Sequence, residues 1–171
     1  DGSEDGWLNF NVMTAGANTS YMQIKAGTGV VFNEDSNDID FRVESNGNTH
    51  MLFVDGGSDH VNIGTDTDYG GRLNIKTGDN TTNLVLVSTD ADASVGPVLD
   101  LYRDSSSPAD NDIMGNINYK AENSAGEIIT YVNLIGVLGD VTDGTEDGQF
   151  RIQTMSAGSN INRISVDTAE T

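Results

Sequence analysis

The chain contains no cysteine. This excludes disulfide bonds and zinc sites built on cysteine thiolates, and it leaves the redox compartment undetermined. No apolar run approaches 18 residues, so no segment is expected to span a membrane. The sequence also lacks an initiator Met and a basic, then apolar leader, and we therefore expect a fragment or mature piece of a larger protein.

Basic residues are scarce: 8 Lys and Arg stand against 27 Asp and Glu, which gives a formal charge of −19. Phosphate groups are bound by Lys and Arg, so this balance argues against nucleic acid and against anionic membrane surfaces as partners. We interpret the carboxylates as a solvated exterior that keeps the protein soluble through self-repulsion. Adaptation to high salt, or bridging by divalent cations, is the alternative.

Helical periodicity is missing as well. Apolar residues alternate with period two, and turn residues interrupt the alternation every eight to fourteen positions or so, which is typical of an all-β protein. Residues 128–138 are apolar on both alternating faces, which predicts a strand buried on both faces. A helix is the alternative there, but the β-branched residues in 128–130 disfavour it.

One stretch occurs twice. Residues 1–18 read DGSEDGWLNFNVMTAGAN, and residues 143–160 read DGTEDGQFRIQTMSAGSN, at an offset of 142 without a gap. The core-face residues Leu8 and Phe10 become Phe150 and Ile152, while the opposite face changes freely. Each copy is therefore predicted to be the same hairpin, with a turn at Ala-Gly, and the chain to hold a little more than one period of a repetitive molecule.

A second hairpin is predicted over residues 39–54. Asn46-Gly47 suits a two-residue type I′ turn, which would place Phe41 opposite Leu52 and Val43 opposite His50. Further expected strands are 60–63, 72–76 paired with 83–88, 97–103, and 113–121 paired with 128–138. The expected domains are a partial repeat hairpin (1–26), a thin hairpin shaft segment (27–71), a larger, sandwich-like β unit (72–142) and the second copy of the opening hairpin (143–171), with a soft boundary near 64–72.

Thin hairpins with one apolar face are marginally stable alone, and the chain has no disulfides to reinforce them. The simplest partner for such a face is another copy of the same chain. We therefore expect an oligomer.

Four acidic clusters are candidate calcium loops: residues 33–38, 66–68, 90–92 and 140–147. None has the EF-hand spacing of ligands, and solvated turns are the favoured interpretation. The only histidines, His50 and His60, have no neighbouring Cys or His that would indicate a zinc or iron site. No G-x-S-x-G motif is present to hold a nucleophilic serine. We therefore predict no catalytic, metal-binding or cofactor-binding residues, and no enzyme activity.

Trp7 and the five tyrosines could stack on sugar rings. Trp7 is replaced by Gln149 in the second copy, so it is expected on the polar face and not in the core. An exposed tryptophan can bind a ligand. An interface or a tolerated surface position is the interpretation we favour.

Several stretches resemble tail-fibre and appendage proteins of tailed bacteriophages, especially marine ones. They include residues 31–45, the segment 51–55 with 61–65, the stretch 99–112, and residues 142–148. In that family the motif at 61–65 often reads V-G-I-G-T, and Asn62 departs from it. The resemblance covers most of residues 1–167, and related segments also occur in bacterial surface proteins.

The resemblance implies a structural segment of a fibrous, usually homotrimeric appendage on a virion or an extracellular surface, with intertwined or side-by-side chains. Such a segment acts as a stiff spacer that presents a host-binding element, and its partners are other copies of itself and a host glycan or protein receptor. The alternatives are a carbohydrate- or receptor-binding module, and a cellular adhesin or surface filament subunit. The family transfers no catalytic residues to these positions.

Overall fold

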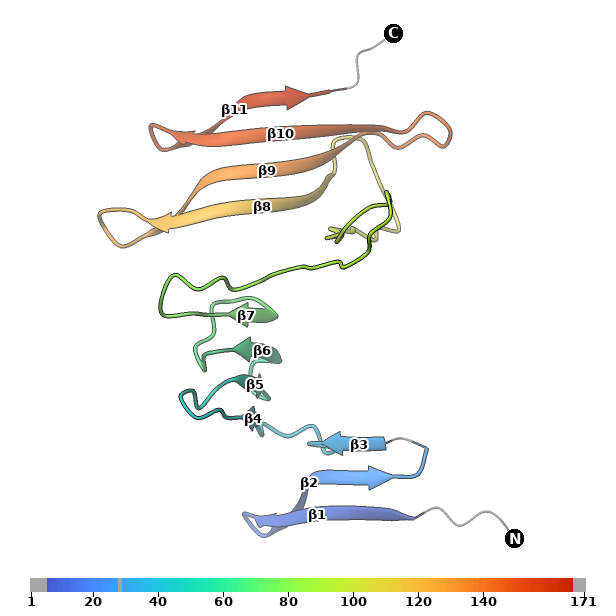
Figure 1. Cartoon of the computed structure of the whole chain (residues 1–171), viewed down its shortest axis with the longest axis vertical. Coiled ribbons are helices and arrows are strands. Elements are labelled where there is room, and N and C mark those ends of the chain that lie inside the picture. The colour runs from blue at the N-terminus through green and yellow to red at the C-terminus, as the bar shows by residue number, and fades with distance from the viewer. Residues whose placement is uncertain (1–5, 28, 168–171) are drawn as a thin grey trace. The chain divides into compact units, whose positions relative to one another are not determined.

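The computed structural model describes residues 6–27 and 29–167, and within them it confirms an all-β protein without helices (Figure 1). The first five residues of the opening repeat lie outside this range. No helix in the described part of the chain is long and apolar enough to cross a membrane. The chain divides into two compact units, residues 1–86 and 87–171. The boundary expected near 64–72 falls inside the first unit.

Unit 1 contains two small sheets. The first has the order β1-β2-β3, with β1 at Trp7–Thr14, β2 at Ala17–Lys25 and β3 at Gly29–Phe32. The second has the order β4-β5-β6-β7, formed by Phe41–Val43, Leu52–Asp55, His60–Ile63 and Leu73–Ile75. The rings of Phe32 and Phe41, 4.7 Å apart between centroids, join the two sheets.

Unit 2 is one four-stranded antiparallel sheet in the order β11-β10-β9-β8. Its strands are β8 at Ile113–Glu122, β9 at Ile128–Asp140, β10 at Asp147–Ser156 and β11 at Ser159–Val166. The pairing of β8 with β9 through a turn at residues 123–127 confirms the prediction for that pair. In the C-terminal half, where a sandwich-like unit is expected, the described strands β8 to β11 form one sheet.

The register predicted for residues 39–54 is wrong by two residues. Phe41 pairs with Val54, and Val43 pairs with Leu52. Neither Asn46 nor Gly47 adopts the positive φ of a type I′ turn. The connection is wider because Asn48 Oδ1 accepts a hydrogen bond from the His50 N–H and the His50 carbonyl accepts one from the Gly64 N–H. A shift of two residues keeps every side chain on its predicted face, whereas a shift of one would not.

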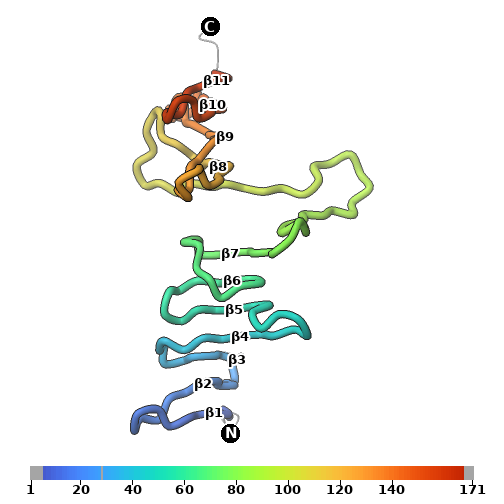
Figure 2. The backbone as a smooth tube through the Cα atoms, turned by 90° about the vertical axis from the view of Figure 1, so that its left-hand side faces the viewer, coloured from blue at the N-terminus to red at the C-terminus, as the bar shows by residue number. Residues whose placement is uncertain are grey.

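The hairpin predicted between 72–76 and 83–88 is also wrong. β7 pairs in parallel with β6, with Asn62 opposite Asn74, and residues 83–88 form no strand. Residues 97–103, predicted as a strand, form none either. Figure 2 shows the chain between β7 and β8 as a long connection without a labelled strand. A parallel pair requires the chain to return across the sheet, and residues 64–72 make that return.

Candidate assembly surface

The duplicated hairpins have the same pairing. Leu8 pairs with Ile24 and Phe10 with Met22, just as Phe150 pairs with Val166 and Ile152 with Ile164. Both copies then skip one residue of the second strand, at Tyr21 and at Arg163, which makes a β-bulge at the same point. The prediction of one shared conformation is confirmed for residues 7–24 and 149–166.

The turns of the two copies agree as well. Ala15 and Gly16 have φ of 50° and 85°, and Ala157 and Gly158 have φ of 47° and 81°. Positive φ at both turn residues is the type I′ geometry that matches the twist of a two-residue hairpin. The copies differ in their neighbours, since β3 joins the second strand of the first copy and β9 joins the first strand of the second copy. Both edges of this hairpin can therefore accept another strand.

The first sheet of unit 1 leaves its apolar face open. The register places on this face two rows of side chains, Leu8-Ile24-Val30 and Phe10-Met22-Phe32. All of them except the partly exposed Met22 are exposed by more than a third. The opposite, polar face holds the buried Ser20 and Gln23.

The second sheet of unit 1 repeats this arrangement. Its apolar face carries Phe41, Val43, Leu52, Val54, Val61, Ile63, Leu73 and Ile75, which are all exposed or half-buried. The opposite face carries the buried Phe53, Asn62 and Asn74. The loop between β6 and β7 contacts that polar face, because Asn74 Nδ2 donates to the Gly71 carbonyl and Asn74 Oδ1 accepts from the Gly71 N–H. The chain's own loop thus contacts the polar side, while the apolar side stays uncovered.

Unit 2 exposes an apolar face too. Ile117, Leu134, Ile152 and Ile164 form one row across its four strands, and Tyr119, Val132, Thr154 and Ile161 form the next. The opposite face holds Ile135 and Val137, which are buried, so β9 is buried on one face and only partly covered on the other. The face with Ile135 and Val137 also carries a row of amides. In this row, Asn133 Nδ2 donates to Gln153 Oε1, and Gln153 Nε2 donates to Asn162 Oδ1.

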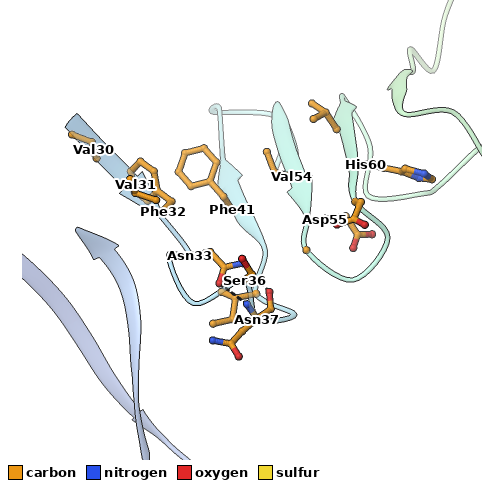
Figure 3. A pocket seen from close by; sticks show the side chains of 14 residues that line it. Val30, Val31, Phe32, Asn33, Ser36, Asn37, Phe41, Val54, Asp55 and His60 are labelled. Atoms are coloured by element: carbon orange, nitrogen blue, oxygen red, sulfur yellow. Dashed lines mark hydrogen bonds between the residues drawn. The ribbon is translucent and has the colours of Figure 1, made fainter. Parts of the chain in front are cut away.

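A groove of about 630 Å³ opens where the two sheets of unit 1 meet (Figure 3). Val30, Phe32, Phe41 and Val54 line it with apolar side chains, and Asn33, Ser36 and Asn37 gather at the loop beside them. Asp55 lies farther along the groove, and the Ser58 N–H that binds its carboxylate, at 2.9 Å, lowers the pKa of Asp55. The groove is thus continuous with the open apolar faces of both sheets.

The acidic loops have protein donors for several of their carboxylates. In residues 33–38, Asp35 Oδ2 accepts the Ser20 N–H at 2.9 Å, and Glu34 lies 2.7 Å from Lys25 Nζ. In residues 140–147, the Thr142 N–H donates to Asp140 and lowers the pKa of that carboxyl. These contacts anchor the loops and do not gather ligands, and the described residues contain no group of three or more His, Asp or Glu able to hold a metal ion.

The two short acidic clusters serve different roles. Asp68 Oδ1 lies 3.0 Å from His60 Nδ1 and accepts the Gly70 N–H, which lowers the pKa of Asp68. Asp66 lies 4.0 Å from the ring of His50. Both histidines therefore face the loop between β6 and β7, which the sequence did not indicate. In residues 90–92, the Asp92 N–H donates to Asp90 Oδ1, as in a local turn.

The exposed Trp7, Tyr69 and Tyr102 lie on separate segments of the chain. Trp7 is exposed on the polar face of β1, as expected, and Lys25 Nζ lies 5.3 Å from its ring. Tyr69 and Tyr102 are exposed on irregular segments of different units. Phe32 and Phe41, which line the groove, were not singled out from the sequence as a binding pair. The alternation of residues 30–32 places Phe32 on the apolar face, but its contact with Phe41 depends on the intervening loop.

Comparison with protein-family models, with curated proteins and with solved structures finds no match to this chain.

Proposed function

We propose that this chain is a structural segment of a bacteriophage tail fibre or a similar extracellular filament, in which three parallel copies cover one another's apolar faces. The observation that carries the proposal is the orientation of the sheets. In each of the three, the chain leaves the apolar face open. Water-exposed apolar surface of this extent marks an interaction site.

The size of the exposed surface supports a large interface. The chain exposes 12795 Å². Two separate globular proteins, each of half the mass, would together expose about 9,700 Å² by the usual scaling of surface with mass. The excess of about 3,000 Å² per chain includes the irregular segment between β7 and β8 as well as the open sheet faces, and it is comparable with the area that obligate oligomers bury.

The repeated hairpin supports the filament. Repeats of one structural unit stack along an axis and contact mainly their neighbours, which gives an extended and stiff molecule. The mechanism is mechanical: the segment holds a host-binding element away from the surface that carries it. Its location on a virion tail, and a glycan or protein receptor as the final partner, follow from the resemblance to tail fibres. A cellular adhesin or surface filament would use the same mechanism.

Two adjacent residues of β1 test the proposal. Phe10 lies on the open apolar face, and Asn11 lies on the opposite face of the same strand. Phe10→Glu places a charge in the interface and should reduce the molar mass, measured by light scattering, from three chains toward one. Asn11→Glu adds the same charge outside the interface and should keep the mass of three chains. If Phe10→Glu also keeps that mass, the apolar face of β1 does not mediate assembly.

A glycan-binding module is the second candidate. The groove favours it, because Phe32 and Phe41 lie beside the polar side chains of Asn33 and Asp55. The two proposals conflict, since the groove opens on the face that a trimer would cover. Oligosaccharide binding by the wild type that is lost in Phe41→Ala would favour this module. Absence of binding across a glycan array would contradict it.

A further inference from the structure

Residues 83–88 have the composition of a β-strand but belong to no sheet in the described structure. The stretch Asn-Leu-Val-Leu-Val-Ser contains no charge, no proline and no glycine. Its four central side chains are exposed, at 59% for Leu84, 65% for Val85, 48% for Leu86 and 73% for Val87. Within the described residues, no backbone N–H or carbonyl of 83–87 makes a hydrogen bond.

Such a segment is unfavourable when it is left open. In a strand, its four consecutive apolar residues would alternate between the two faces, which is the pattern of a strand covered on both faces. An exposed, uncharged stretch of high β-propensity is also a hazard for aggregation. Among the described residues the segment has neither a ladder partner nor full side-chain cover.

β8, the first strand of the sheet in unit 2, has an edge to which such a segment could pair. β8 pairs only with β9, so its outer edge has no strand partner in the described structure, and Arg103 Nη1 donates to the Ile113 carbonyl at its first residue. Its first seven residues, 113–119, carry no charge, and Lys120 is the first charged residue along it. Natural proteins blunt or cover exposed edges of this kind.

We infer that residues 83–88 become a strand only on assembly, by adding to the outer edge of β8 in a second copy of the chain. The inference rests on the proposed oligomeric filament and specifies how its copies join. Backbone hydrogen bonds to a neighbouring copy would satisfy the segment and the edge at the same time. The copies would then be intertwined through this segment and not only packed face to face.

Proline substitutions test the pairing. Neighbouring N–H groups of a strand point in opposite directions, so either Val85→Pro or Leu86→Pro must remove a hydrogen bond to the neighbouring copy. No hydrogen bond within the described part of the chain is lost, because these N–H groups make none there. At least one of the two variants should lose the trimer mass in light scattering. Ala91→Pro, in the exposed loop nearby, is the matched control and should keep it.

Hydrogen exchange gives an independent readout on the wild type. In the assembled protein, amides of 84–87 should exchange at least about tenfold more slowly than those of the loop 90–93. The disruptive proline variant should also speed exchange along residues 113–119. Fast exchange at 84–87 in a wild-type trimer, two proline variants that both keep the trimer, or unchanged exchange along β8 would each overturn the pairing. A wild type that is a single chain would instead overturn the proposed function.

Discussion

Asn62 and Asn74 form a buried polar pair in unit 1. Asn62 is fully buried, and its Oδ1 accepts a hydrogen bond of 2.7 Å from Asn74 Nδ2, while its own Nδ2 has no hydrogen-bond partner among the described residues. A buried acceptor that loses its donor bears the full cost of desolvation. The two residues thus contribute unequally to the pair, because Asn74 supplies the hydrogen-bond donor and also binds Gly71.

We expect Asn74→Leu to lower the free energy of unfolding by about 1–3 kcal/mol, because Asn62 Oδ1 is left without a donor. Asn62→Leu should cost less, because it also removes the unpaired Nδ2. Urea unfolding measures both, with the exposed Asn80→Leu as a control. A larger loss for Asn62→Leu than for Asn74→Leu would contradict this account of the pair.

Asp79 provides a prediction about pH. The Thr77 hydroxyl, at 2.7 Å, is the main cause that lowers the pKa of Asp79 to about 2. Because folding lowers this pKa, the stability that Asp79 contributes is present above pH 3.8 and is lost as the pH falls toward 2. NMR titration should show that Thr77→Val moves the pKa of Asp79 back toward 3.8, whereas Thr82→Val does not. A wild-type value near 3.8 would refute the assignment.

At the scale of elements, the two hairpin turns should respond alike. Ala15 and Ala157 occupy a left-handed conformation that costs an L-residue about 1 kcal/mol and that Asn tolerates better. Ala15→Asn and Ala157→Asn should therefore each raise the free energy of unfolding, by up to about 1 kcal/mol. Changes of opposite sign in chemical unfolding would show that the two turns are not equivalent.

The acidic loops should hold their shape without a metal ion. Their carboxylates bind backbone and side-chain donors of the protein, as Asp35 and Asp140 do. Thermal melts with and without a chelator should therefore agree. A fall of more than roughly 5 °C with chelator, which corresponds to about 1 kcal/mol for a domain of this size, would identify one loop as a calcium site.

Local features of the strands could be predicted from the sequence, but several pairings could not. Period-two alternation assigned Phe41 and Leu52 to one face, and the repeat assigned the shared hairpin. The type I′ turn predicted at Asn46-Gly47 does not form. Instead, Asn48 Oδ1 accepts the His50 N–H, and the His50 carbonyl accepts the N–H of the distant Gly64. The parallel pairing of β6 with β7 is likewise set by a returning loop, and no local pattern specifies it. The open side of each sheet depends on which face those loops contact.

At the scale of the whole molecule, charge would oppose the proposed assembly, while apolar surface would drive it. Each chain carries a formal charge of −19, so three chains that associate bring three times that charge together. Salt screens this repulsion and leaves the hydrophobic contribution in place. Assembly should therefore tighten as salt is added, unlike an interface held by ion pairs.

The most direct test of the assembly is the molar mass of the wild-type chain in solution. Light scattering at micromolar concentration and about 1 M salt, where charges are screened beyond about 3 Å, should give the mass of three chains of 18.1 kDa each. The mass should shift toward smaller species as salt is removed. The mass of a single chain at high salt would contradict the account, because the open apolar faces would then have no partner.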